Sequence, residues 1–148
     1  MSFSVGTAFE QFCSNLRFSD AKVSTISTRY HAITKRINTD YWNSFSDEAH
    51  SFYVGSYGRD TEILTSDIDM LVQLPAATYQ KFNAYSSNGQ SALLQEVKKI
   101  LEKTYSVTSL KADGQIISIP FTDGINFEVL PAFLNAGGTY TFANSNNG

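Results

Sequence analysis

Three carboxylates in two apolar segments are the residues of this sequence best suited to chemistry. Asp67 and Asp69 open the segment Asp67–Gln73, and Glu128 lies in a second segment, Ile125–Leu130. Side chains on a strand alternate between its two faces, so both aspartates project to one side and their apolar neighbours to the other. If the two strands lie side by side, the three carboxylates converge.

Carboxylates crowded on one face repel each other and raise each other's pKa unless a cation lies between them. Oxygen ligands of this kind suit Mg²⁺ or Mn²⁺. Three carboxylates can hold two such ions about 3.5–4 Å apart, an arrangement that serves in-line phosphoryl and nucleotidyl transfer. We therefore expect Asp67, Asp69 and Glu128 to be catalytic metal ligands for two ions.

Gly55-Ser56 precedes the two aspartates and suits the binding of phosphate. Glycine lets the backbone approach a phosphate closely, while the serine hydroxyl and nearby N–H groups can donate hydrogen bonds to it. We expect Gly55 and Ser56 to hold the phosphates of a nucleoside triphosphate. Arg59 could also touch phosphate, but a structural or solvated role explains it equally well.

Hydrophobic periodicity predicts an α/β fold, with a mixed twisted sheet that carries the carboxylates on one face and helices on the other. Helices are expected over Thr7–Leu16, over Asp20–Asn43 and around 93–101, the last with Lys98, Lys99 and Lys103 on a solvated face; strands are expected at Phe52–Val54, Asp67–Gln73, Gln115–Phe121 and Ile125–Leu130, and a loop at Asn135–Gly148.

Composition narrows the classes of function. The chain has 148 residues, enough for one domain with a buried core, and its net charge is −3. Proteins that grip long nucleic acid are normally basic, so this charge argues against nucleic acid as the ligand and favours small anions held through metals. The single cysteine, Cys13, favours a reducing, cytoplasmic setting. We expect no membrane partner, since no signal peptide or bilayer-length apolar run is present.

The motifs resemble those of a known superfamily. Gly55-Ser56, ten residues, then Asp67-Ile68-Asp69 and a later strand acid is similar to the pattern of the polymerase-β-like nucleotidyltransferases. Within that superfamily, the fuller runs are similar to those of the bacterial CD-NTases (SMODS domains), relatives of cyclic GMP-AMP synthase and oligoadenylate synthetase. These runs are Val54–Thr61, Ser66–Leu71 and Phe127–Phe133.

This resemblance implies a polymerase-β-like fold with a long N-terminal helix. It makes Asp67, Asp69 and Glu128 the metal ligands and Gly55 and Ser56 the cradle of the triphosphate; Glu128 stands where many members have aspartate. The implied activity is synthesis of a cyclic di- or trinucleotide, or a related oligonucleotide second messenger, from nucleoside triphosphates such as ATP or GTP. The implied setting is antiphage (CBASS-type) signalling, with regulators from the same defence operon as partners.

Members of the family continue into a helical C-terminal lobe. We therefore expect residues 1–148 to be the N-terminal catalytic lobe of a longer protein, with an apolar patch where the missing lobe docks.

Two alternatives remain. One is another polymerase-β-like nucleotidyltransferase, either a minimal protein- or antibiotic-modifying type or an RNA-tailing type. The long helix before Gly55 and the wide gap between Asp69 and Glu128 speak against the minimal type. The other is a catalytically silent nucleotide-binding sensor, which would have no need for three metal-holding carboxylates.

Overall fold

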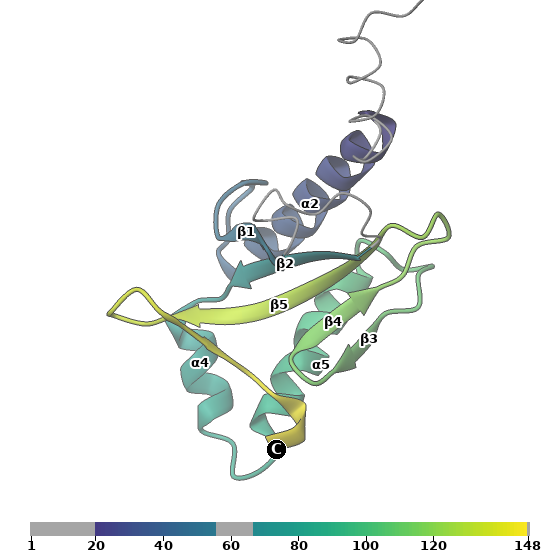
Figure 1. Ribbon diagram of the computed structural model, residues 1–148. Coiled ribbons are helices and arrows are strands. Elements are labelled where there is room, and N and C mark those ends of the chain that lie inside the picture. Colours follow the sequence, from purple (N-terminus) through teal and green to yellow (C-terminus); the bar gives the residue numbers. More distant parts are fainter. Residues whose placement is uncertain (1–19, 56–66, 148) are drawn as a thin grey trace, which may run out of the picture.

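The computed structural model describes residues 20–55 and 67–147, which form a mixed sheet with helices on one face (Figure 1). The expected helix at 7–16 lies outside these ranges. The strands are β1 (Ser51–Val54), β2 (Asp67–Gln73), β3 (Lys111–Asp113), β4 (Ile116–Ile119), β5 (Asn126–Leu134) and β6 (Tyr140–Phe142). The helices are α2 (Asp20–Tyr41), α4 (Ala76–Asn83), α5 (Gly89–Glu102) and the short 3₁₀ turn η1 (Ser145–Asn147).

The sheet is built around one parallel pair of strands. Its order is β1-β2-β5-β4-β3, and β6 pairs with the end of β5. β2 and β5 run parallel, whereas the other neighbouring pairs are antiparallel. The expected mixed sheet is therefore confirmed.

The core lies between the sheet and the helices. Apolar side chains that alternate along β2, β5 and β4 are fully buried, and they meet the apolar stripes of α2 and α5. The strands contribute Ile68, Met70, Val72, Phe127, Val129, Ile117 and Ile119; the helices contribute Ile26, Ile33, Ile37, Leu94, Val97 and Leu101. Burying each of these side chains contributes about 1.5–3 kcal/mol. The helices thus occupy one face, as expected, and leave the other face to the carboxylates.

Polar contacts tie the three helices together. Glu96 of α5 accepts hydrogen bonds from the Tyr41 hydroxyl of α2 (3.0 Å) and from Lys81 of α4 (2.7 Å). Lys103, just after α5, pairs with Asp40 of α2 at 2.7 Å. None of the helices in the described part of the chain is both long and apolar enough to cross a bilayer.

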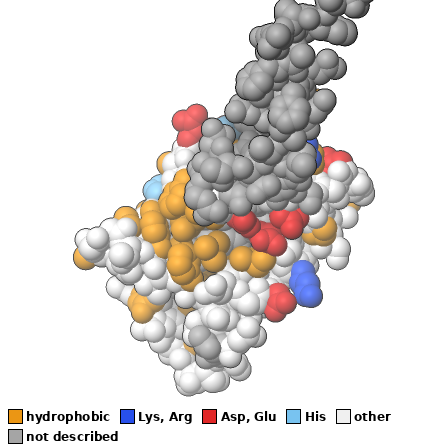
Figure 2. Space-filling model, viewed as in Figure 1, with side chains coloured by type: hydrophobic (Ala, Val, Ile, Leu, Met, Phe, Trp, Pro, Cys, Tyr) orange, Lys and Arg blue, Asp and Glu red, His pale blue; other side chains and the backbone are white. Residues whose placement is uncertain are grey.

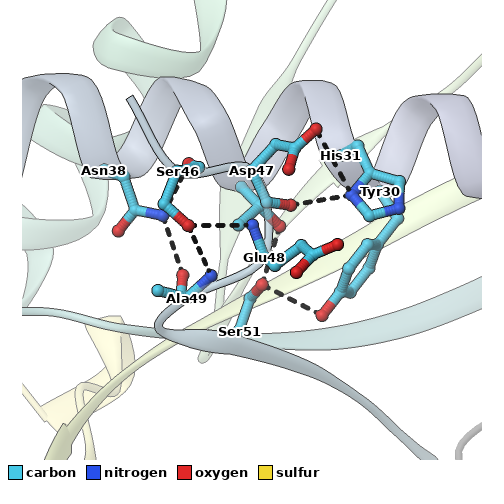
Figure 3. A network of polar contacts seen from close by, with 9 residues as sticks. Tyr30, His31, Asn38, Ser46, Asp47, Glu48, Ala49 and Ser51 are labelled. Carbon is cyan, nitrogen blue, oxygen red and sulfur yellow. Dashed lines mark hydrogen bonds and ion pairs between the residues drawn. The ribbon is translucent and has the colours of Figure 1, made fainter. Parts of the chain in front are cut away.

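A buried asparagine fixes the connection from α2 to β1 (Figure 3). Asn38 is fully buried, and its Nδ2 donates to the carbonyls of Ser46 (2.9 Å) and Ala49 (2.8 Å). Its Oδ1 can only accept, so Nδ1 of His50, 2.7 Å away, carries the proton. Burial lowers the pKa of His50, which stacks on Trp42 with the ring centroids 3.8 Å apart. The connection is therefore held by a neutral network.

Helix α2 ends two residues earlier than the predicted Asn43. Asn43 adopts the left-handed conformation (φ 51°), and the N–H of Ser44 donates to the carbonyl of Asn38 at 3.1 Å. A left-handed residue directly after the last turn is a common way for a helix to end, because it turns the chain away from the helix axis.

Several elements were not anticipated. Helix α4 and strand β3 were not predicted, the expected strand Gln115–Phe121 is shorter, and the expected loop Asn135–Gly148 contains β6 and η1. These elements are short, and α4 buries only Phe82, so they carry little periodic signal.

β5 continues four residues past the predicted end at Leu130, through Pro131. The carbonyl of Ala132 accepts from the N–H of Leu74 in the segment after β2 (2.8 Å), so the backbone groups of Pro131 point to the opposite side of β5. On that side β4 pairs only with 127–129 and β6 only with 132–134. The missing N–H of Pro131 therefore falls in a gap between partners and costs no ladder hydrogen bond.

We predict that Asn38→Ala lowers the free energy of unfolding by about 2–4 kcal/mol, because two buried carbonyls lose their donor. Urea-induced unfolding, followed by circular dichroism, measures this. Thr39→Ala is the matched control: it removes an exposed hydroxyl that donates to the carbonyl of Lys35, and should change stability by less than about 0.5 kcal/mol. Equal stability of the two variants would contradict the assigned role of Asn38.

Candidate active site

The parallel pairing of β2 with β5 brings the three predicted acids together on the face of the sheet that no described helix covers. Asp69 lies opposite Glu128 in the register, and Asp67 lies opposite Asn126. Nδ2 of Asn126 donates to Oδ1 of Asp67 at 3.4 Å. Two segments 59 residues apart thus form one acidic site.

The crowding of these acids changes their titration. A hydrogen bond to Asp69, partial burial, and the charges of Asp69 and Asp67 raise the pKa of Glu128 to about 7. Near neutral pH, a proton therefore competes for the position between the two carboxyl groups. Within 20–55 and 67–147, no three His, Cys, Asp or Glu side chains are already arranged as a metal site. The donor set nevertheless suits a divalent cation, which would replace the proton and relieve the repulsion.

Gly55 lies directly against Asp69. It has φ +65°, and a Cβ atom there would approach Oδ2 of Asp69 to 2.6 Å. Only a residue without a side chain lets the backbone come this close, as expected for a phosphate cradle. Ser56 and Arg59, the other residues considered for phosphate, lie outside the described residues, so their roles stay predictions.

Contacts between strand β1 and helix α2 hold Gly55 next to the acids. The hydroxyl of Ser51 donates to the Tyr30 hydroxyl at 3.0 Å (Figure 3), and Tyr53 stacks on Tyr30 with the ring centroids 4.3 Å apart. Val54, the last residue of β1, pairs with Asp69. Helix α2 thus positions β1, and β1 in turn positions Gly55 beside Asp69.

An apolar area adjoins the acids on the same face, where Figure 2 shows orange side chains beside a red group. Phe52, Leu71 and Leu130 are consecutive partners across three strands. Leu71 and Leu130 lie two residues after Asp69 and Glu128, on the same face. The ring of Phe52 contacts Tyr140 of β6, with the centroids 5.7 Å apart. An apolar area therefore adjoins the acids, and the docking of a further lobe there stays a prediction.

A cavity of about 550 Å³ lies elsewhere, between the α4–α5 turn and β6. It is lined by aromatic, amide and other uncharged residues, including Tyr79, Tyr85, Asn88 and Phe142. Without a charge, it offers nothing to neutralise a triphosphate, so we place the candidate active site at the acids.

Two polar neighbours of the acids were not singled out from the sequence. Asn126 lies on the face of Glu128, and Ser118 of β4 pairs with Glu128 from the other side. Each is a polar residue between apolar ones, in Ile125-Asn126-Phe127 and Ile117-Ser118-Ile119. This alternation of polar and apolar residues was the sequence signal that could have placed Asn126 and Ser118 on the face of the acids.

Residues 3–148 match the family model of the Second Messenger Oligonucleotide or Dinucleotide Synthetase (SMODS) domain. The chain belongs to the SMODS family. A search of curated proteins returned no match.

Solved structures share the fold of this SMODS chain. The CD-NTase CdnG of Bradyrhizobium diazoefficiens, in complex with GTP, is 18% identical, with a TM-score of 0.62 over 90% of this chain and 41% of its own. The cyclic dinucleotide synthase CdnE of Elizabethkingia meningoseptica, with GTP and Apcpp, is 16% identical, with a TM-score of 0.54 over 95% of this chain and 50% of its own.

The CdnC:HORMA-deltaN complex of E. coli MS115-1 gives 13% identity and a TM-score of 0.58, over 92% of this chain and 45% of its own. At these identities the likeness establishes the fold alone, which is the polymerase-β-like fold of the CD-NTases. The SMODS chain spans half or less of the length of these structures.

The raised pKa of Glu128 predicts that metal affinity depends on pH. Below about pH 7 the carboxyl group holds a proton that an incoming cation must displace, so Mg²⁺ or Mn²⁺ should bind more tightly as pH rises, by up to about tenfold per unit, and level off above 7. Calorimetric titration between about pH 5.5 and pH 8.5 measures this. Glu128→Gln should bind weakly and lose this dependence; an unchanged pH profile would show that another group titrates.

The contact of Gly55 with Asp69 predicts a selective effect of Gly55→Ala. The added Cβ displaces the Asp69 carboxylate, so metal affinity should fall by about tenfold or more, as expected for a displaced ligand. Gly124→Ala is the matched control, since Gly124 also has positive φ (+81°) but no atom lies within 4 Å of the added Cβ. Both variants should lose about 1 kcal/mol of stability. If both bind metal equally, the steric argument fails.

Proposed function

We propose that this chain is the catalytic lobe of a metal-dependent nucleotidyltransferase. Its product would be a cyclic di- or trinucleotide, or a related oligonucleotide second messenger, made from nucleoside triphosphates. One observation carries the proposal: in a chain of the SMODS family, Asp69 and Glu128 face each other across parallel strands, with Asp67 beside them and the Gly55 backbone against Asp69.

The acids and the Gly55-Ser56 pair have separate roles in this proposal. Two Mg²⁺ or Mn²⁺ ions, when bound, would neutralise the triphosphate and lower the pKa of the attacking hydroxyl. Asp67, Asp69 and Glu128 would hold these ions from one face of the sheet. Gly55 would let the backbone approach the phosphates, and Ser56 would donate a hydrogen bond to them.

The reaction is an in-line displacement. A 2′- or 3′-hydroxyl of one nucleotide forms a bond to the α-phosphorus of another, the bond to the bridging oxygen of pyrophosphate breaks, and the hydroxyl proton is released. Positioning and charge stabilisation account for most of the acceleration in such reactions. A rigid β2–β5 pair suits that task, because its register fixes the spacing between the acids.

The solved neighbours support nucleoside triphosphates as substrates, since the CdnG structure contains GTP and the CdnE structure contains GTP and Apcpp. We further propose that a C-terminal helical lobe covers the apolar area beside the acids, which is consistent with neighbours at least twice as long as the matched part. The resemblance also leads us to place the signal in antiphage defence.

We predict that Asp69→Asn lowers product formation by at least about 100-fold while the fold is retained, because an amide of the same shape loses the charge that holds the metal. The assay incubates the protein that contains this chain with all four nucleoside triphosphates and Mg²⁺, and identifies products by mass spectrometry. Asp47→Asn, in an exposed loop, is the control and should be fully active. Undiminished synthesis by Asp69→Asn would remove this residue from the site.

A further inference from the structure

Four residues form a row across the sheet face that carries the acids. Asp69 pairs with Glu128, Glu128 with Ser118, and Ser118 with Lys111. Paired residues on neighbouring strands project to the same face. Ala112 packs inward against the core, which confirms that Lys111 faces outward on the side of the acids.

Lys111 is a distinctive cation among the described residues. It is the only Lys or Arg on the six strands that the structure describes, it is exposed, and it forms no ion pair within 20–55 and 67–147. Ser118, a small residue, lies between Lys111 and Glu128 in the register. At the ordinary strand spacing, β3 lies about 10 Å from β5, which a flexible lysine side chain and a phosphate group can bridge together.

The two flanks of the acids must receive different parts of the reactants. Gly55, the proposed phosphate cradle, lies on the β1 side of Asp69, so the triphosphate that loses pyrophosphate belongs there. In an in-line displacement, the attacking hydroxyl enters opposite the leaving group. The nucleotide that supplies this hydroxyl therefore belongs on the β4–β3 side, where Lys111 stands.

We propose that Lys111 binds the 5′-phosphates of the nucleotide that supplies the attacking hydroxyl, and so acts as a positioning residue. This inference rests on the proposed function. A compact ammonium is a good partner for phosphate, and Lys111 has no described carboxylate to satisfy it. The competing explanation is that Lys111 only keeps the exposed edge strand β3 soluble, as lysines on sheet edges often do.

The test measures binding of a second nucleotide without turnover. The protein that contains this chain, saturated with Mg²⁺ and the non-hydrolysable analogue Apcpp, is titrated with each of the four nucleoside triphosphates and, separately, with the corresponding nucleosides. We expect Lys111→Gln to weaken binding of the preferred triphosphate by about tenfold and to leave its nucleoside unchanged, since one charged contact is lost. Lys111→Arg should keep most of the affinity. Lys99→Gln, which removes an exposed lysine of α5, should match the wild type.

A kinetic measurement separates positioning from folding. Lys111→Gln should raise KM for the hydroxyl-supplying nucleotide while kcat at saturation stays near the wild-type value. Equal weakening of triphosphate and nucleoside, no weakening at all, or a wild type that binds no second nucleotide would overturn the assignment. Failure of the proposed function has a different signature: the wild type would make no product from the four triphosphates, whatever the second-nucleotide titration gives.

Discussion

Repulsion between Asp69 and Glu128 is the constraint on which the site depends. Parallel pairing places the two carboxyl groups on one face at adjacent positions, and Asp67 adds a third negative charge. Two carboxylates so close cannot both stay charged at little cost, so a proton or a cation must lie between them. The surrounding elements hold this unfavourable arrangement in place: α2 and α5 bury the opposite face of both strands, and β1 adds the closely approaching backbone of Gly55.

Much of this architecture could be predicted from the sequence, because its central elements bury strong periodic patterns. Alternation along β2 indicated the shared face of Asp67 and Asp69, and the predicted range Asp67–Gln73 is the observed one. The stripe on α2 predicted that helix, with an end at Asn43 that lies two residues past the observed end at Tyr41. The juxtaposition of Glu128 with Asp69 is different: alternation shows which face each residue takes, whereas the pairing of two distant strands had to be assumed. The structure supplies that pairing, but the roles of these acids in metal binding and of Gly55 and Ser56 in phosphate binding remain predictions.

The C-terminal part of β5 and the edge strand β3 were not predicted, and each for a physical reason. From sequence alone, Pro131 predicts the end of a strand. The structure shows why β5 continues: Pro131 lies between the segment that pairs with β4 and the segment that pairs with β6. A three-residue edge strand such as β3 carries too little alternation to be recognised, and Lys111 stayed unnoticed with it. Short elements at the margin of the sheet take their conformation from their partners, so a sequence pattern describes them poorly.

The parallel pair at the centre also determines when the site can come into existence. Its two strands are far apart in sequence, and the crossover that joins them contains α4, α5, β3 and β4. Contacts of such long range form late in folding, because closing a large loop costs conformational entropy before the contacts themselves can stabilise the chain. During synthesis on the ribosome, Asp67 and Asp69 emerge well before Glu128. A nascent or truncated chain would therefore hold two of the acids without the third, and the complete acidic site would mark a chain whose whole crossover has folded.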